Sequence, residues 1–240
     1  MLREALFALV AFTAVSPYVA QVASAQAVES KPTPAWEIAL QARHNELIQK
    51  NGAGTDTALR DQLLRMGAED QAARGFEHGK QVSGMTKEML QKLAPTDIRL
   101  TGELQQIVQK NGWPTIALVG IDASNAAMLV LTHTADHEWQ RQLLPQLQSL
   151  ADADKIDGSS LALVVDKELV AEGKMQRYGS QFKFINGAMA MFAVEDPGGL
   201  DQRRAKALLP PLAIYKQMLS DMYHLKTTDD VVMATAPAKK

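Results

Sequence analysis

The stretch that decides the fold class runs from residue 161 to residue 194 and reads LALVVDKELVAEGKMQRYGSQFKFINGAMAMFAV. Its first five residues, Leu161 to Val165, form a short apolar run that is partly β-branched, and two polar residues follow. A second stretch extends through Gly173, and a third covers Ala188 to Val194. Short apolar runs separated by polar and glycine-bearing breaks are typical of strands. We therefore predict a small antiparallel β-meander here.

Helical signals dominate the rest of the chain. Apolar residues recur at spacings of three and four, and several of these stretches begin at a capping residue or end at glycine or proline. The sequence therefore predicts an α+β fold that is mostly helical, with its antiparallel β-meander in the C-terminal half. The predicted helices cover Trp36 to Lys50, Asp56 to Arg74, Thr86 to Leu93, Asp97 to Lys110, Asp122 to His133, Glu138 to Leu150, and the two flanks of Pro210-Pro211.

The composition excludes several classes of protein. The 240 residues are 46% apolar and 22% charged, with 25 Lys and Arg against 27 Asp and Glu. This balance predicts no nucleic-acid partner, because phosphate binding needs a basic face. The absence of cysteine excludes disulfides, zinc ribbons, iron–sulfur clusters and thiol nucleophiles.

The N-terminal residues resemble an export signal. Arg3 precedes the apolar run Ala5 to Val15, and Ala23-Ser24-Ala25 provides a cleavage site with small residues at the required spacing. The apolar run is too short to cross a bilayer as a helix, which favours a secretory signal peptide over residues 1–25. Because Glu4 offsets the charge of Arg3, a buried or anchoring N-terminal helix is the alternative.

The remaining chain is predicted to form one domain. We expect a flexible leader at 26–35, an α+β domain at 36–227 and a disordered tail at 228–240. No second apolar run approaches 18 residues, so no membrane span is expected in the mature chain. An exported chain without cysteine fits a periplasmic or secreted location.

The order of several polar, glycine and proline positions resembles the uncharacterised bacterial proteins grouped as domain-of-unknown-function family 6624. The resemblance covers about Leu59 to Tyr215 and implies no particular activity. Lys167 and Ser180 depart from it, because the family favours arginine and threonine there. The residues that carry the resemblance are Asp70-Gln71, Arg74, Gly112 to Thr115, Gly120, His133, Asp136, Gln140, Leu163, Asp166, Gly173, Gln176, Tyr178 to Gln181, Asp201, Arg203-Arg204, Leu208, Pro210, Leu212 and Tyr215.

His133 is the strongest candidate for chemistry. It stands three residues before Asp136 at a predicted helix end, and imidazole titrates near neutral pH without special perturbation. His133 could therefore act as a general base, or it could cap the helix and bond to neighbouring backbone. The spacing to His137 would suit a metal, but no third ligand is evident and we predict no metal site.

Three other positions could bind a ligand. Trp113 could present its indole at the mouth of a cleft, or it could be buried at a chain corner. Tyr178 to Gln181 could form a binding loop or a structural β-bulge. Arg74 could hold an anionic ligand, or it could pair with Asp70 or Asp166 inside the fold.

No Gly-x-Ser-x-Gly elbow, P-loop or dinucleotide fingerprint occurs, and no cofactor is predicted. We expect a periplasmic binding or interaction domain for a small polar ligand or a protein partner. Its polar cleft would be lined by Trp113, His133, Asp136, Asp166, Tyr178 and Gln181, with Arg74 nearby.

Two alternatives to this function remain open. The first is a hydrolase that uses His133 as general base, with Asp136 or Asp166 orienting it or activating water. The second is a purely structural role, in which the same side chains form a buried hydrogen-bond network that fixes how helices meet the meander.

Overall fold

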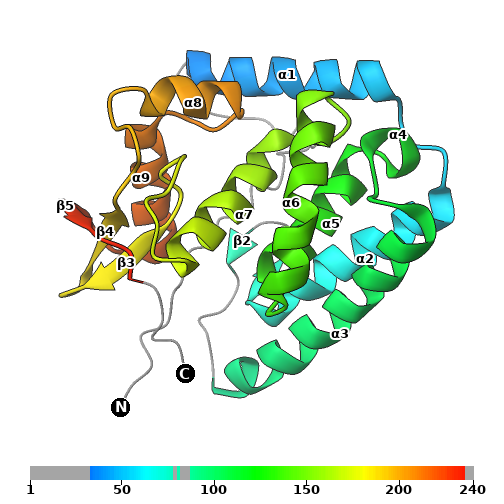
Figure 1. The fold of residues 1–240 in the computed structure, drawn as a ribbon, viewed down its shortest axis with the longest axis horizontal. Helices are drawn as coiled ribbons and strands as arrows, with labels where there is room; N and C mark the ends of the chain where they lie inside the picture. The colour runs from blue at the N-terminus through cyan, green and yellow to red at the C-terminus, as the bar shows by residue number, and fades with distance from the viewer. Residues whose placement is uncertain (1–32, 78–79, 82–86, 236–240) are drawn as a thin grey trace, which may run out of the picture.

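The computed structural model describes residues 33–77, 80–81 and 87–235. The predicted signal peptide, most of the predicted leader and the last five residues of the predicted tail lie outside these ranges. Within them the chain forms nine helices and five short strands (Figure 1). The prediction of a mostly helical α+β fold is therefore confirmed.

Seven helices form the larger part of the molecule. Carboxylates cap three of them: Asp56, Asp136 and Asp157 each accept a backbone N–H in the first turn. The helices are α1 (Ala35–Asn51), α2 (Thr57–Ala73), α3 (Lys87–Asn111), α4 (Ile116–Val119), α5 (Ile121–His133), α6 (His137–Asp152) and α7 (Gly158–Ala171).

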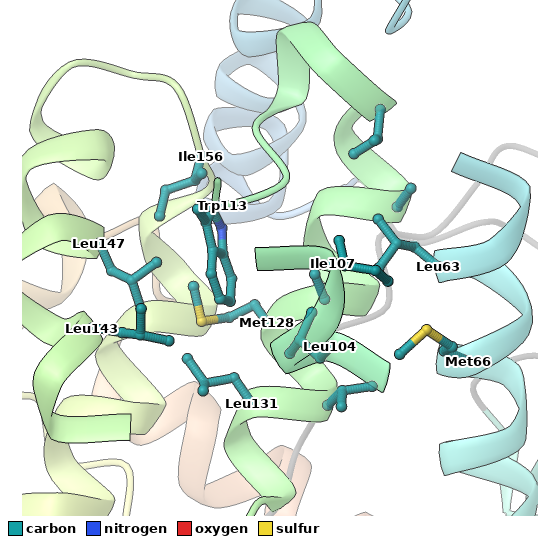
Figure 2. Close-up of a cluster of buried hydrophobic side chains, with 14 of the residues drawn as sticks. Leu63, Met66, Leu104, Ile107, Trp113, Met128, Leu131, Leu143, Leu147 and Ile156 are labelled. Carbon is teal, nitrogen blue, oxygen red and sulfur yellow. The ribbon is translucent and has the colours of Figure 1, made fainter. Parts of the chain in front are cut away.

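The main hydrophobic core lies between α2, α3, α5, α6 and α7. Figure 2 shows side chains from several of these helices meeting around the ring of Trp113 and the thioether of Met128. The fully buried members include Leu63, Leu104, Leu131, Leu147 and Val164. None of the described helices combines the length and the apolar composition that a membrane crossing requires.

The predicted helix boundary at Pro95 is wrong. Residues 87–111 form one helix, α3, with Pro95 inside it. The expected cap, Asp97, accepts a hydrogen bond from Arg74 instead of starting a helix. Leu100 and Leu104 are buried in the core, and this packing holds α3 across the proline.

The predicted strands over residues 161–173 are also wrong, because this stretch forms helix α7. Its apolar run continues on all sides of the helix, and the buried positions include Leu161, Val164, Asp166, Glu168 and Val170. A helix buried all round shows no 3.6-residue alternation, so a short apolar run cannot be distinguished from a buried strand by periodicity.

The C-terminal sheet has three strands, β3 (Phe182–Ile185), β4 (Ala188–Phe192) and β5 (Thr227–Val232), in that order. Strands β3 and β4 form an antiparallel hairpin whose turn, Asn186-Gly187, has positive φ at both residues. Strand β5 pairs with β4 in parallel, so the sheet is not the purely antiparallel meander predicted. A separate two-stranded ribbon joins β1 (Phe76–Glu77) to β2 (Lys80–Gln81).

The parallel pairing follows from the helical crossover between β4 and β5. This crossover contains α8 (Leu200–Lys206) and α9 (Leu212–Tyr223), and parallel neighbours need a connection of this kind. Tyr215 and Leu219 of α9 pack on Phe182 and Met189 of the sheet. Residues 228–232 therefore belong to the fold, although the sequence predicted them to be disordered.

Helix α1 lies across one end of the helical part (Figure 1). Leu47 packs against Ile116 and Ile121, and both Arg43 and Lys50 form ion pairs with Asp154 in the turn after α6. The first helix is thus attached by a small apolar contact and by charges at its C-terminal half.

Candidate functional site

The last residue of α5, His133, meets the C-terminal end of α2. Its Nδ1 lies 2.6 Å from Oδ1 of Asp70, and the two side chains are 7% and 1% exposed. The helices approach closely because α2 carries a glycine at the contact: a Cβ built on Gly67 would lie 2.8 Å from the Cβ of Ala126. This close approach brings together two groups that are 63 residues apart in the sequence.

Arg74 binds the same carboxylate oxygen of Asp70. Its Nη1 donates to Asp70 Oδ1 at 3.0 Å and to the Asp70 carbonyl at 3.1 Å, and its Nη2 donates to Asp97 Oδ1 at 2.8 Å. Gln71 Nε2 also contacts Asp70 Oδ2, at 3.3 Å. Of the two predicted roles for Arg74, the structure therefore places it in internal ion pairs, one of them with Asp70.

Lys167 of α7 reaches the same helix end. Its ammonium donates to the carbonyl of Thr132, the residue just before His133. Burial lowers the pKa of Lys167, whereas the carboxylates of Glu168 and Asp97 act in the opposite direction. Lys167 therefore lies in the cluster as a desolvated amine without an ion-pair partner in the described part of the chain.

Burial favours the neutral form of the His133 imidazole. Burial lowers its pKa; Asp70 opposes this effect, and the positive charges of Arg74 and Lys167 reinforce it. An ion-paired carboxylate accepts hydrogen bonds, so Nδ1 carries the proton and Nε2 carries a lone pair. Nε2 is buried and has no hydrogen-bond partner within the described structure. We call the group Asp70, Arg74, Asp97, His133 and Lys167 the His133 site.

A second histidine–carboxylate pair joins the first residue of α6 to α7. His137 Nδ1 is 2.6 Å from Oε1 of the buried Glu168, and Arg141 Nη1 is 3.4 Å from Oε2. The His137 side chain is 42% exposed. Among the residues that the structure describes, no three His, Asp or Glu side chains are arranged to hold a metal ion.

Neither carboxylate predicted to orient His133 bonds to it. Asp136 caps α6 by accepting the backbone N–H of Trp139 at 3.0 Å, and its other oxygen accepts from Gln105. Asp166 bonds to a different segment, described below. Asp70 takes the place predicted for them.

Asp166 fixes the loop that contains Tyr178 and Gln181. Its two oxygens accept the backbone N–H groups of Arg177, Tyr178 and Ser180 at 2.7–3.2 Å, together with the Ser180 hydroxyl at 2.8 Å. Burial raises the pKa of Asp166, and these hydrogen bonds counteract the rise. Gln181 is itself buried, and its backbone N–H donates to Gln176 Oε1 at 2.8 Å.

Arg204 connects the same loop to the segment before α9 by binding one backbone carbonyl in each. Its guanidinium donates to the carbonyls of Tyr178 at 2.6 Å and Pro210 at 2.7 Å, and it lies 4.7 Å from the ring centroid of Tyr215. Arg204 is 0% exposed. The loop is therefore held between a buried anion and a buried cation, and residues 177–179 form bends rather than the predicted β-bulge.

Trp113 belongs to the main core. It is 3% exposed and packs among Met128, Leu147 and Ile156 (Figure 2). Of the two predictions for this indole, the buried chain corner is the one observed.

Trp113 lies in the core and Asp136 caps α6, and the other five predicted site residues separate into two groups. His133 and Arg74 lie together in the His133 site, whereas Asp166, Tyr178 and Gln181 surround the loop near the sheet. Sequence reasoning missed Asp70 as the partner of His133. The available signal was the resemblance, which contained Asp70, but no spacing rule connects α2 with the end of α5.

These features define a mostly helical α+β protein with a histidine–carboxylate pair where α2, α5 and α7 meet. The chain belongs to the family of unknown function DUF6624, whose model matches residues 57–228. This match confirms the resemblance found in the sequence. Neither the search of curated proteins nor the search of solved structures found a match.

Proposed function

We propose that the protein is an exported binding domain that takes a small polar ligand at the His133 site. The observation that carries this proposal is the buried His133 Nε2, which has no partner within the described structure while Nδ1 is fixed by Asp70. Buried polar atoms in folded proteins almost always have a hydrogen-bond partner, and leaving one unpaired costs about 1–3 kcal/mol. A ligand atom that donates to Nε2 would recover this cost.

A screen of polar metabolites and cell-wall fragments by thermal shift tests the binding role. We expect at least one compound to raise the melting temperature of the full chain, and His133→Phe to abolish the rise. His44→Phe, on α1, is the control and should keep it. The proposal fails if no compound stabilises the wild-type protein, or if stabilisation is the same in His133→Phe.

A hydrolase is the second candidate, and the Asp70–His133 hydrogen bond favours it. A carboxylate on Nδ1 fixes the tautomer in which Nε2 accepts a proton, and it stabilises the imidazolium that forms. Nε2 would take a proton from a water molecule as the water attacks the substrate. Asp70, rather than Asp136 or Asp166, would orient the histidine.

Hydrolysis of chromogenic esters, phosphates and glycosides tests this second candidate. Asp70→Asn should lower any such activity at least about 100-fold, because His133 then loses the tautomer and orientation that it needs as general base. Asp136→Asn is the matched control, because Asp136 only caps α6 and accepts from Gln105. Equal losses in the two variants would contradict the assignment.

The periplasmic or secreted location is part of the same proposal and rests on residues 1–25. The apolar run and the Ala23-Ser24-Ala25 site support cleavage after Ala25. Fractionation of cells that express a C-terminally tagged chain, followed by N-terminal sequencing, tests it. A tagged protein that stays in the cytoplasm with residues 1–25 attached would contradict it.

A further inference from the structure

We infer that the His133 site recognises a neutral hydroxyl group, so that its ligand is an uncharged polyol or saccharide rather than an anion or an amine. This inference rests on the proposed binding function and specifies the chemistry of the ligand.

The first recognition group is an acceptor. His133 donates from Nδ1 to Asp70, and its neutral ring leaves only the lone pair on Nε2. A carboxylate or phosphate oxygen cannot donate to this lone pair. The ligand must therefore present an O–H or N–H.

The second recognition group is a donor at the same helix end. An ammonium carries three N–H donors, and Lys167 uses one of them on the Thr132 carbonyl. Thr132 directly precedes His133, so the amine and the imidazole belong to one end of α5. The remaining N–H groups of Lys167 bond to no acceptor within the described residues, so they can donate to a ligand atom.

The guanidinium of Arg74 is already occupied and cannot bind an anionic ligand. Arg74 is the natural fork for a carboxylate or phosphate, but its Nη1 and Nη2 are occupied by Asp70 and Asp97. Arg74 pairs with both carboxylates, and with Lys167 counted the four charged groups of the site sum to zero. An added anion or cation would give this buried group a net charge, which is costly.

A hydroxyl group meets both requirements without adding charge. It donates its proton to His133 Nε2 and accepts from Lys167 with an oxygen lone pair. An uncharged saccharide or polyol presents such a group together with others that can bond to the surrounding surface.

The experiment compares ligands that differ mainly in charge. Titration calorimetry of the full chain uses a neutral set, glucose, N-acetylglucosamine, inositol and glycerol, and a charged set, glucuronate, glucose 6-phosphate and glucosamine. We expect saturable binding of at least one neutral compound and at least tenfold weaker binding of the charged ones. Lys167→Met and His133→Gln should each weaken the neutral ligand at least tenfold, whereas Lys155→Met, at an exposed lysine, should not.

The outcomes separate this inference from the function on which it rests. If only charged compounds bind, and His133→Gln abolishes their binding, the assignment to a neutral hydroxyl is wrong. The proposed binding function of the His133 site is then still supported. Binding of no compound in either set would overturn the assignment, and the broader thermal-shift screen then decides the binding role independently. Neutral binding that survives both His133→Gln and Lys167→Met would overturn the assignment of these two residues.

Discussion

At the scale of single residues, the chemistry of the protein centres on His133. The histidine was predictable as a candidate because few side chains titrate near neutral pH. Its partner was not predictable, because the Asp70 contact depends on how closely α2 packs on α5. The same packing removes water from the imidazole and lowers its pKa, so protonation of His133 is coupled to folding.

This coupling predicts how stability depends on pH. Histidine in the unfolded chain has a pKa of about 6.5, and the pKa of His133 in the folded chain is lower. Below a pH of about 6.5, unfolding is therefore accompanied by uptake of a proton by His133. The wild-type protein should lose up to about 1.4 kcal/mol per pH unit relative to His133→Gln as the pH falls below about 6.5, until the folded pKa is reached.

Urea unfolding from pH 8 to pH 5 measures this difference. His44→Gln is the control and should run parallel to the wild type. Parallel curves for the wild type and His133→Gln over the whole range would contradict the buried neutral histidine.

At the scale of elements, α7 connects the two parts of the molecule. Asp166 and Lys167 are neighbours on this helix, but one holds the loop beside the sheet and the other reaches the end of α5. The sequence predicted the helices with polar and apolar faces, such as α2 and α6, but it predicted α7 as strands. A helix buried on every side lacks the alternation on which such predictions depend.

The Asp166→Ala variant tests the role of α7 in fixing the loop. Removal of the carboxylate leaves three backbone N–H groups without their acceptor, those of Arg177 and Tyr178 partly buried and that of Ser180 fully buried. We expect a loss of about 3–5 kcal/mol in the free energy of unfolding. Hydrogen exchange should show lost protection at Tyr178 and Ser180.

Asp152→Ala, at the exposed end of α6, is the control and should cost less than about 1 kcal/mol. An unchanged exchange rate at Ser180 in Asp166→Ala would count against the proposed anchor.

The contact between the α1–α2 loop and the α4–α5 corner gives a second element-scale prediction. Gly54 has φ +91°, and a Cβ there would lie 2.4 Å from the backbone nitrogen of Gly120. Gly52 also has a positive φ, +82°, but a Cβ there would meet nothing within 4 Å. Gly52→Ala should therefore cost only the backbone strain of about 1–3 kcal/mol, and Gly54→Ala should cost more.

Denaturant unfolding of the two alanine variants checks this prediction. Equal losses of stability at the two positions would show that the close approach of the two loops carries no energetic weight.

At the scale of the whole molecule, the helical core and the C-terminal sheet belong to one family unit. The family match over residues 57–228 covers α2 to α9 together with β3 and β4, and it ends at the second residue of β5, the strand that completes the sheet beside β4. The sequence predicted the mostly helical α+β class and a C-terminal sheet. It could not predict the parallel strand, because Asp229 and Asp230 interrupt the apolar pattern of β5.

Truncation tests whether β5 belongs to the folded domain. A chain that ends at Lys226 keeps the acceptor of the Met189 N–H but loses Val232, whose carbonyl accepts the Ala193 N–H at 2.8 Å. We expect this variant to melt at a lower temperature and to lose exchange protection at Ala193. A chain that ends at Thr235 is the control, and unchanged protection of Ala193 in the shorter chain would contradict the strand assignment.

The central claim is that Asp70 holds His133 as a neutral imidazole whose Nε2 is available to a ligand. The most direct measurement is the ¹⁵N NMR spectrum of the His133 ring at neutral pH, assigned with His133→Gln. We predict a protonated Nδ1 and an unprotonated Nε2, and Asp70→Asn should disturb this pattern. A doubly protonated ring, or a proton on Nε2 instead of Nδ1, would contradict the claim.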